Sequence, residues 1–255
     1  MKASTIWAKR WFRIGVTALF WLAVWQAAAV LLPKLLFAGP VPTVRSLLSL
    51  LRNSEFWFSI GYSLGKIAAG FLLAFGAGCL LAVVCRRMPV LRMLLGPLIQ
   101  GMKSLPVACF IVVALIWVRS EWISVLTAFF VVFPAVYINL GEGLRHTDQG
   151  MLEMARLFHL TPAKRLRAVW LPACLPYLLS ACRVSVGMAL KAGVAGEIIG
   201  LPRRSIGEQL YLSKLYLNTA DLFAWSLVII LLSLALERLL VSALAAVQRK
   251  WGTAV

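Results

Sequence analysis

The sequence predicts an all-α, polytopic membrane protein with six transmembrane helices in a single domain over residues 1–255. Hydrophobic residues make up 62% of the chain and charged residues 14%, whereas soluble domains have about half and about a quarter. Several apolar runs also approach the roughly 20 residues that cross a bilayer core. With a mean hydropathy of +0.89, this composition excludes a water-soluble enzyme.

The expected spans are separated by loops that contain proline, glycine or clustered charge. They cover residues 14–32, 61–84, 94–118, 122–140, 171–200 and 222–247. The first apolar run follows a basic segment but exceeds the usual 7–15 residues of a signal-peptide core, so we expect an uncleaved span. In the third span only Val107–Val118 is continuously apolar. Leu94–Leu105 completes this span as part of a helix kinked near Pro106.

Two rows of small residues indicate close helix packing. One row repeats every four residues in the second span and comprises Gly70, Ala74, Gly78 and Ala82. The other lies in the fifth span and comprises Ala192, Gly196 and Gly200. In lipid, small side chains let helix backbones approach each other, so each row is expected to face another helix.

The basic residues predict the orientation. With both termini in the cytoplasm, the segments on that side hold about twice as many basic residues as the outer segments, which is the sense of the positive-inside rule. The cytoplasmic residues are Lys2, Lys9, Arg10, Arg13, Arg86, Arg87, Arg92, Arg145, Arg156, Lys164, Arg165, Arg167, Arg249 and Lys250. The net charge of +17 is therefore attributed to loops facing anionic lipid, and no nucleic-acid partner is expected.

Residues 145–170 are too polar for a span and read as two short amphipathic helices around a turn. Asp148 can cap the first helix, and Thr161-Pro162 suits the start of the second, which Pro172 should limit. An apolar side is expected from Leu152, Ala155, Leu157 and Phe158. From the residues alone, this loop is either a docking element for a cytoplasmic partner or an amphipathic hairpin on the membrane surface.

Four ionisable residues fall in the expected spans, where such groups are costly and often functional: Lys66, Arg183, Lys191 and Glu197. Arg183 and Lys191 are eight residues apart and can share a side of one helix. These residues either lend charge to a translocation pathway or pair between helices, and Arg183 and Glu197 can instead take an interfacial position. Lys66 can instead extend its amine to the outer interface. The five cysteines show no metal-binding or disulfide spacing.

Several motifs resemble those of a known family. Glu153-Met154-Ala155, His159 and Val169-x-Leu171-Pro172 follow the spacing of the EAA motif in membrane-spanning subunits of binding-protein-dependent ABC importers, with His159 where that motif has glycine. Ser63–Phe71 resembles the S-L-x-R-x-x-x-G-F signature of nitrate/sulfonate/taurine-type permeases, with Lys66 in the place of arginine. Ala195–Gly200 resembles the A-A-E-x-I-G sequence near the end of their fifth helix.

The resemblance implies a type I importer permease in the bacterial inner membrane, with coupling helices between the fourth and fifth spans. Partners would be two copies of an ABC ATPase subunit, a second permease copy in a homodimer and an extracytoplasmic binding protein. ATP and Mg²⁺ would bind the ATPase, since this chain has no phosphate-binding G-x-x-x-x-G-K-[ST] loop and binds no cofactor itself. The implied ATPase-coupling residues are Glu153, Ala155, Arg156, Phe158, His159, Leu160 and Thr161.

The implied substrate is a small anion such as a sulfonate, taurine or nitrate. One alternative is a secondary transporter or channel that works without an ATPase, for which an inverted repeat would be expected. Another is a membrane enzyme, which would need an Asp, Glu or His cluster, and the nine acidic residues are scattered singly. We therefore expect a transport subunit without a catalytic or metal site.

Overall fold

A computed structural model describes residues 3–33 and 35–251, and the described residues contain helices but no strand. The chain divides into two compact units, one formed by Met1–Phe58 with Gln209–Ile229 and the other by Ser59–Glu208 with Ile230–Val255. The expectation of one domain over residues 1–255 stays a prediction.

The first unit contains α1 (Ala3–Leu31), α2 (Pro40–Leu50) and the start of α11 (Thr219–Trp251). Aromatic rings join α11 to its neighbours in this unit. Trp25 of α1 stacks on Phe223 with ring centroids 6.1 Å apart, and Phe56, at the start of the next helix, packs on the buried Trp225 at 4.9 Å. The indole of Trp25 also donates a 3.0 Å hydrogen bond to the Ala38 carbonyl. These contacts give the unit its own apolar core.

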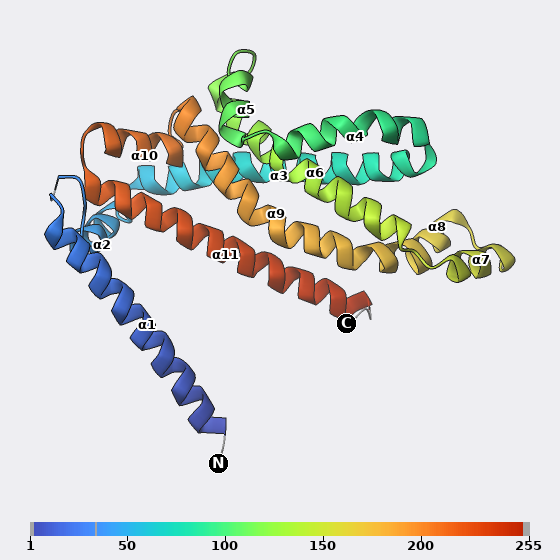
Figure 1. Cartoon of the computed structure of the whole chain (residues 1–255), viewed down its shortest axis with the longest axis horizontal. Coiled ribbons are helices and arrows are strands. Elements are labelled where there is room, and N and C mark those ends of the chain that lie inside the picture. The colour runs from blue at the N-terminus through green and yellow to red at the C-terminus, as the bar shows by residue number, and fades with distance from the viewer. Residues whose placement is uncertain (1–2, 34, 252–255) are drawn as a thin grey trace. The chain divides into compact units, whose positions relative to one another are not determined.

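The second unit contains most of α3 (Ser54–Arg87) and the helices that follow it. These are α4 (Pro89–Ser104), α5 (Val107–Ala114), η1 (Ser120–Trp122), α6 (Ile123–Arg145), α7 (Gln149–Leu157), α8 (Pro162–Arg165), the π-helical η2 (Leu166–Trp170), α9 (Leu171–Gly200) and the start of α10 (Ile206–Leu215). The most extensive packing is between α6 and α9, which lie side by side (Figure 1).

Both predicted rows of small residues pack against α6. A Cβ at Gly70 of α3 would collide with the Val125 carbonyl oxygen of α6, and one at Gly196 of α9 would lie 2.9 Å from the Thr127 hydroxyl. Ala74 and Ala82 are buried on the same face of α3. The prediction of close helix packing is confirmed, with α6 as the shared partner.

Four helical segments of the described chain are long and apolar enough to cross a membrane. They are Ser54–Arg87, Ser120–Arg145, Pro162–Gly200 and Thr219–Ala243. They contain or overlap the second, fourth, fifth and sixth expected spans. The apolar part of α1, Gly15–Leu31, overlaps the first expected span but is shorter than the roughly 20 residues that cross a bilayer core. Six spans therefore remain a prediction.

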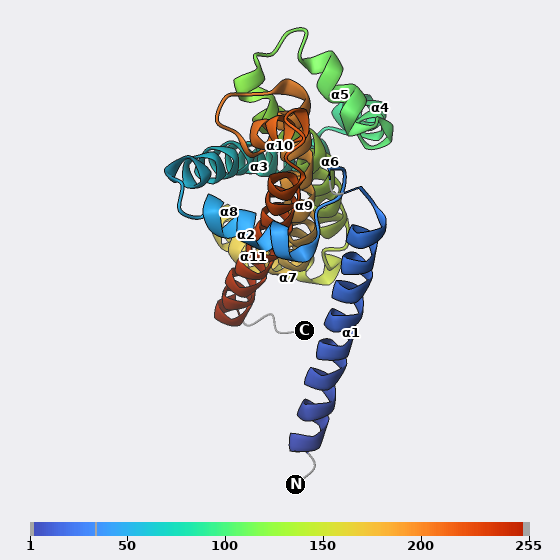
Figure 2. The same cartoon turned by 90° about the vertical axis from the view of Figure 1, so that its left-hand side faces the viewer.

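The expected third span is not one kinked helix. The helices α4 and α5 are separate and bent by 106° at the break between them (Figure 2). Leu105 and Pro106 are both extended, with ψ of 126° and 130°. A residue before proline avoids the α conformation, so the helix ends at Ser104 instead of kinking. By length and composition the pair is a broken span or a re-entrant loop.

Candidate functional site: the hairpin between α6 and α9

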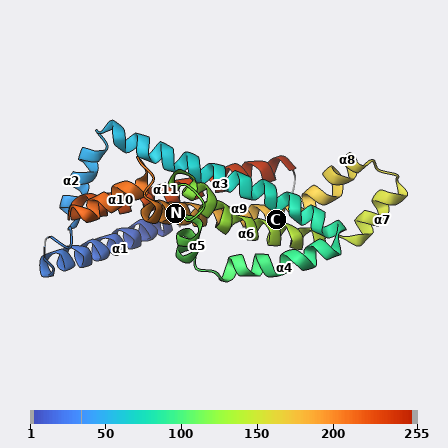
Figure 3. The ribbon, with the colours of Figure 1, turned by 90° about the horizontal axis from the view of Figure 1, so that it is seen from above.

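The segment between α6 and α9 folds as a hairpin, which we define as Gln149–Trp170 and which comprises α7, a turn, α8 and η2. It projects beyond the ends of α6 and α9 (Figure 1, Figure 3). Asp148 caps α7 by accepting a 2.8 Å hydrogen bond from the Gly150 N–H, as the sequence predicts. Thr161 precedes α8 with Pro162 at the first turn, although its hydroxyl makes no capping bond.

The turn after α7 is built around His159, which has a left-handed backbone with φ of 48°. The His159 N–H donates to the Arg156 carbonyl and the Leu160 N–H to the Ala155 carbonyl, each at 3.0 Å. This pair of bonds is the Schellman motif, which satisfies the last carbonyls of a helix. Glycine is the usual residue at its left-handed position, so His159 holds a conformation that glycine adopts more easily.

The inner side of the hairpin is a small apolar cluster of Leu152, Ala155 and Val169, all buried, with Leu160 packed against them. Leu160 therefore supplies the hydrophobic contact that commonly accompanies a Schellman turn. Ala155 is 3% exposed, so its methyl group belongs to the packed interior of the hairpin. The cluster joins α7 to η2 and fixes the shape of the hairpin.

The outer side of the hairpin exposes large apolar side chains. Leu157 and Phe158 are 78% and 72% exposed, and Met151 and Met154 are about half exposed. Beside Met151, Met154 and Phe158 lies a shallow apolar hollow of about 220 Å³. Of the four residues predicted to form one apolar side, Leu152 and Ala155 are buried and Leu157 and Phe158 are exposed, and Phe158 borders the same hollow as Ala155.

The prediction that Pro172 limits the second helix is wrong. Helical structure continues from Pro162 to Gly200, through η2 and into α9. Pro172 has no N–H to bond the Ala168 carbonyl, and the π-helical turn lies directly before it, where that ladder is already altered. The hairpin is thus continuous with a candidate membrane span.

Arg86 links the end of α3 to both arms of this region. Its guanidinium donates to the Leu144 carbonyl in α6 and stacks over the Trp170 ring at 4.2 Å. Trp170 ends η2 and packs against the inner cluster of the hairpin. The hairpin is therefore connected to three helices: through the chain to α6 and α9, and through Arg86 to α3.

At the opposite end of α9, Glu197 is fully buried and joins four segments. Its carboxyl accepts hydrogen bonds from Ser63 in α3 at 2.8 Å, Ser124 in α6 at 2.9 Å and the Gly207 N–H in α10 at 3.1 Å. The Ser63 hydroxyl in turn accepts from the Ile206 N–H at 3.0 Å. This is the inter-helix alternative for Glu197, since its bonds are to protein groups that hold the helices together.

The three basic residues predicted inside the spans form no ion pair with Glu197 in the described part of the chain. The Lys66 amine lies over the Trp122 ring, 3.9 Å from its centroid, and is half-buried. Arg183 and Lys191 are both exposed on α9. The pathway role of these three residues stays a prediction. No group of three or more metal-ligating side chains occurs among the described residues.

Sequence reasoning missed two kinds of residue. Ser63 and Ser124 are hydrogen-bond partners of Glu197, and the only signal was a hydroxyl inside an apolar run. Met151 and Met154 contribute to the exposed face, and their helical spacing with Phe158 could have indicated it.

Comparisons with known proteins cover both the hairpin and the Glu197 region. The family of inner membrane components of binding-protein-dependent transport systems matches residues 74–252, which include the hairpin and Glu197. The chain belongs to this family. It is therefore a permease subunit of the ABC importer type and a multi-pass membrane protein, as the motifs predict.

Individual relatives of this permease come from several bacteria. It is 27% identical over 212 residues to a putative aliphatic sulfonates transport permease of Bacillus subtilis, covering 80% of this chain and 74% of the relative. It is 26% identical over 190 residues to a bicarbonate transport permease of Synechocystis, covering 71% and 67%. A probable ABC transporter permease of Haemophilus influenzae is 28% identical over 222 residues, covering 84% and 88%.

Proposed function

We propose that this permease forms the translocation pathway of an ATP-driven importer for a small anion and that the hairpin receives the movement of a separate ATPase subunit. The observation that carries the proposal is the hairpin itself. Its inner side is locked by Leu152, Ala155 and Val169, while Phe158 and its apolar neighbours are left exposed. Exposed apolar patches of this kind favour a protein partner.

Of the seven residues expected in coupling, five are exposed and available to a partner: Glu153, Arg156, Phe158, His159 and Thr161. Ala155 and Leu160 act differently, because they pack inside the hairpin and hold its shape. The ATPase would contact the exposed five, with Phe158 as the main apolar anchor. ATP and Mg²⁺ would be held by that partner.

Continuity of the helix from Pro162 to Gly200 gives a route for the movement. A push on α7 would pass through the buried cluster to η2 and then along α9. Arg86 would carry part of it to α3 through Trp170. This corresponds to the rigid-body switching of helices between two states, driven by ATP binding and hydrolysis in the partner.

The charge distribution supports an orientation with both termini and the hairpin in the cytoplasm. In that orientation two ATPase copies would serve two permease copies in a homodimer, and a binding protein would deliver solute from outside. A sulfonate, taurine or nitrate is the expected kind of substrate. The named transport of sulfonates and of bicarbonate by two relatives supports the choice of a small anion.

The test is co-purification of the tagged permease with the ABC ATPase encoded beside it, followed by uptake in proteoliposomes. Wild-type permease should retain the ATPase, and Phe158→Asp should lose most of it. Tyr216→Asp is the matched control, because Tyr216 is 75% exposed but lies in a loop expected on the outer face. Substrate uptake by the permease alone would contradict the proposal and favour a secondary transporter.

A further inference from the structure

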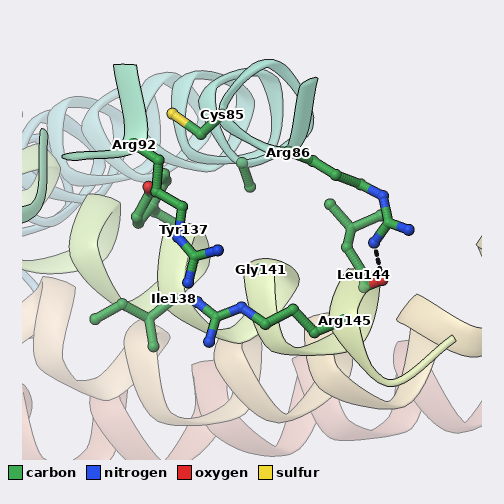
Figure 4. Close-up of a pocket in the computed structure, with 9 residues that line it drawn as sticks. Cys85, Arg86, Arg92, Tyr137, Ile138, Gly141, Leu144 and Arg145 are labelled. Carbon is green, nitrogen blue, oxygen red and sulfur yellow. Dashed lines mark hydrogen bonds between the residues drawn. The ribbon is translucent and has the colours of Figure 1, made fainter. Parts of the chain in front are cut away.

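A cavity of about 220 Å³ lies between α3, α4 and α6, at the end of these helices nearest the hairpin. Three arginines contribute to its wall: Arg86 from α3, Arg92 from α4 and Arg145 from α6 (Figure 4). The remaining lining includes Tyr137 and no Asp or Glu. Three fixed positive charges therefore line one space without an acidic residue in its wall.

The three guanidiniums are not equivalent. Arg86 is engaged by the Leu144 carbonyl and the Trp170 ring. The side chains of Arg92 and Arg145 extend toward the same space from opposite walls (Figure 4). Tyr137 lines the cavity beside them. The guanidinium of Arg92 makes no hydrogen bond or ion pair within the described part of the chain, although its backbone N–H donates to the Met88 carbonyl at 3.2 Å.

Glu142 is the nearest acidic group and does not balance this charge. It pairs with Arg145 at 3.1 Å and with His146 at 3.6 Å, and its side chain is 39% exposed. The Arg145 side chain is itself 52% exposed, so solvent screens both charges of this ion pair, and Arg86 and Arg92 have no acidic partner in the cavity wall. The cavity thus keeps a net positive potential, and bringing like charges together there is unfavourable unless an anion joins them.

We propose that this cavity binds a phosphate group, held between the guanidiniums of Arg92 and Arg145. Guanidinium presents a planar fork of N–H donors that matches phosphate oxygens. The phosphate can come from the headgroup of an anionic phospholipid or from free inorganic phosphate. Basic pockets between transmembrane helices on the cytoplasmic side bind anionic headgroups in other membrane proteins.

The surroundings of Arg92 favour the lipid source. The next residues of α4, Met93 and Leu94, are 70% and 65% exposed, and Leu98 one turn further is 57% exposed. An apolar helix surface beside the cavity mouth suits the acyl chains of a lipid whose headgroup enters the cavity. A bound phosphate would tie α4 to α6 close to the start of the hairpin.

The experiment uses the full-length permease in nanodiscs of phosphatidylcholine, with and without phosphatidylglycerol. Retained lipid is counted by native mass spectrometry, and the thermal unfolding midpoint is measured in parallel. The variants are Arg92→Gln, and Arg92→Gln combined with Arg145→Gln. Arg87→Gln is the matched control, because Arg87 is an exposed neighbour at the end of α3 that does not line the cavity. Inorganic phosphate is titrated in the phosphatidylcholine discs as a separate arm.

Wild type and Arg87→Gln should retain phosphatidylglycerol selectively, and affinity should fall about fivefold for each cavity arginine removed. Stabilisation of wild type by inorganic phosphate alone, lost in the Arg92→Gln variants, would support the site with free phosphate as its source. The proposal would be overturned if the Arg92→Gln variants responded to both anions as Arg87→Gln does. An equal loss in all variants would also overturn it, because that outcome reflects surface charge alone.

Discussion

His159 is the residue at which this permease departs from the glycine of the EAA-like motif, yet the turn is complete. Both hydrogen bonds of the Schellman motif are present around it. Histidine is among the residues that enter the left-handed region more readily than β-branched ones do, so the turn survives with moderate strain. The strain is confined to the backbone of His159, which is exposed, and the buried cluster of the hairpin is unaffected.

We predict that His159→Gly keeps or increases substrate-stimulated ATP hydrolysis in the assembled complex, because glycine adopts φ of 48° without strain. His159→Val should weaken the hairpin by about 1–2 kcal/mol, since a β-branched residue resists this conformation. His159→Val should therefore lose coupling that His159→Gly retains. Equal losses in both would mean that the imidazole itself contacts the partner.

Glu197 contributes through the groups that it satisfies. Glu197→Ala would leave the Ser63 and Ser124 hydroxyls and the Gly207 N–H buried without their acceptor. We expect a loss of at least about 2 kcal/mol in stability, measured as the unfolding midpoint of the purified permease. Glu197→Gln keeps one acceptor oxygen and should lose less. Glu55→Ala, at an exposed site, is the control, and a midpoint for Glu197→Ala equal to that of the control would contradict this role.

At the scale of helices, α6 is the element on which α3 and α9 assemble. Glycines and alanines on those two helices bring their backbones close to it. The exposed faces remain large and apolar, as a membrane protein requires. An added methyl group should therefore lower stability where a glycine contacts α6 and have little effect where a glycine faces open space.

A matched pair of substitutions in α3 tests this packing. Gly70→Ala places a methyl group against the Val125 carbonyl oxygen, which belongs to the backbone of α6 and cannot swing away. We expect a cost of about 1–3 kcal/mol in stability and a lower yield of folded permease. Gly65→Ala, in the same helix with nothing within 4 Å, should be neutral or slightly stabilising. A neutral Gly70→Ala would mean that α3 and α6 are further apart.

The elements that the sequence predicted well are those with local signals. Asp148 caps a helix two positions away, and the two rows of small residues are visible as a four-residue repeat within one helix. The effects of Pro106 and Pro172 on their helices were both predicted wrongly, and in opposite directions. At Pro106 two successive extended residues end the helix, whereas at Pro172 a π-helical turn carries the chain through. Hydropathy does not distinguish these outcomes, because both prolines stand in apolar surroundings.

At the scale of the whole molecule, the family and the position of the hairpin were predictable, but the long-range contacts were not. Ser63 and Glu197 are separated by 134 positions, and Arg86 and Leu144 by 58. No spacing rule connects such residues. The hydroxyl and carboxyl partners become visible only when α3, α6 and α9 are packed together.

Orientation is tested by cysteine accessibility in a variant without the five native cysteines. A cysteine at Thr161 should react with an impermeant maleimide only from the cytoplasmic side, and one at Tyr216 only from the outer side. The positive-inside distribution of charge is the reason for this expectation. Labelling of both positions from one side would contradict the proposed topology.

Contact between the hairpin and the ATPase is tested most directly by site-specific crosslinking. Phe158→Cys, in the cysteine-free permease, would be treated with a short bifunctional reagent in the complex with the ATPase, with and without ATP. We predict a permease–ATPase adduct whose yield changes with nucleotide, and none from a cysteine at Tyr216. Failure of Phe158→Cys to crosslink in a complex that still hydrolyses ATP in response to substrate would contradict the role of the hairpin.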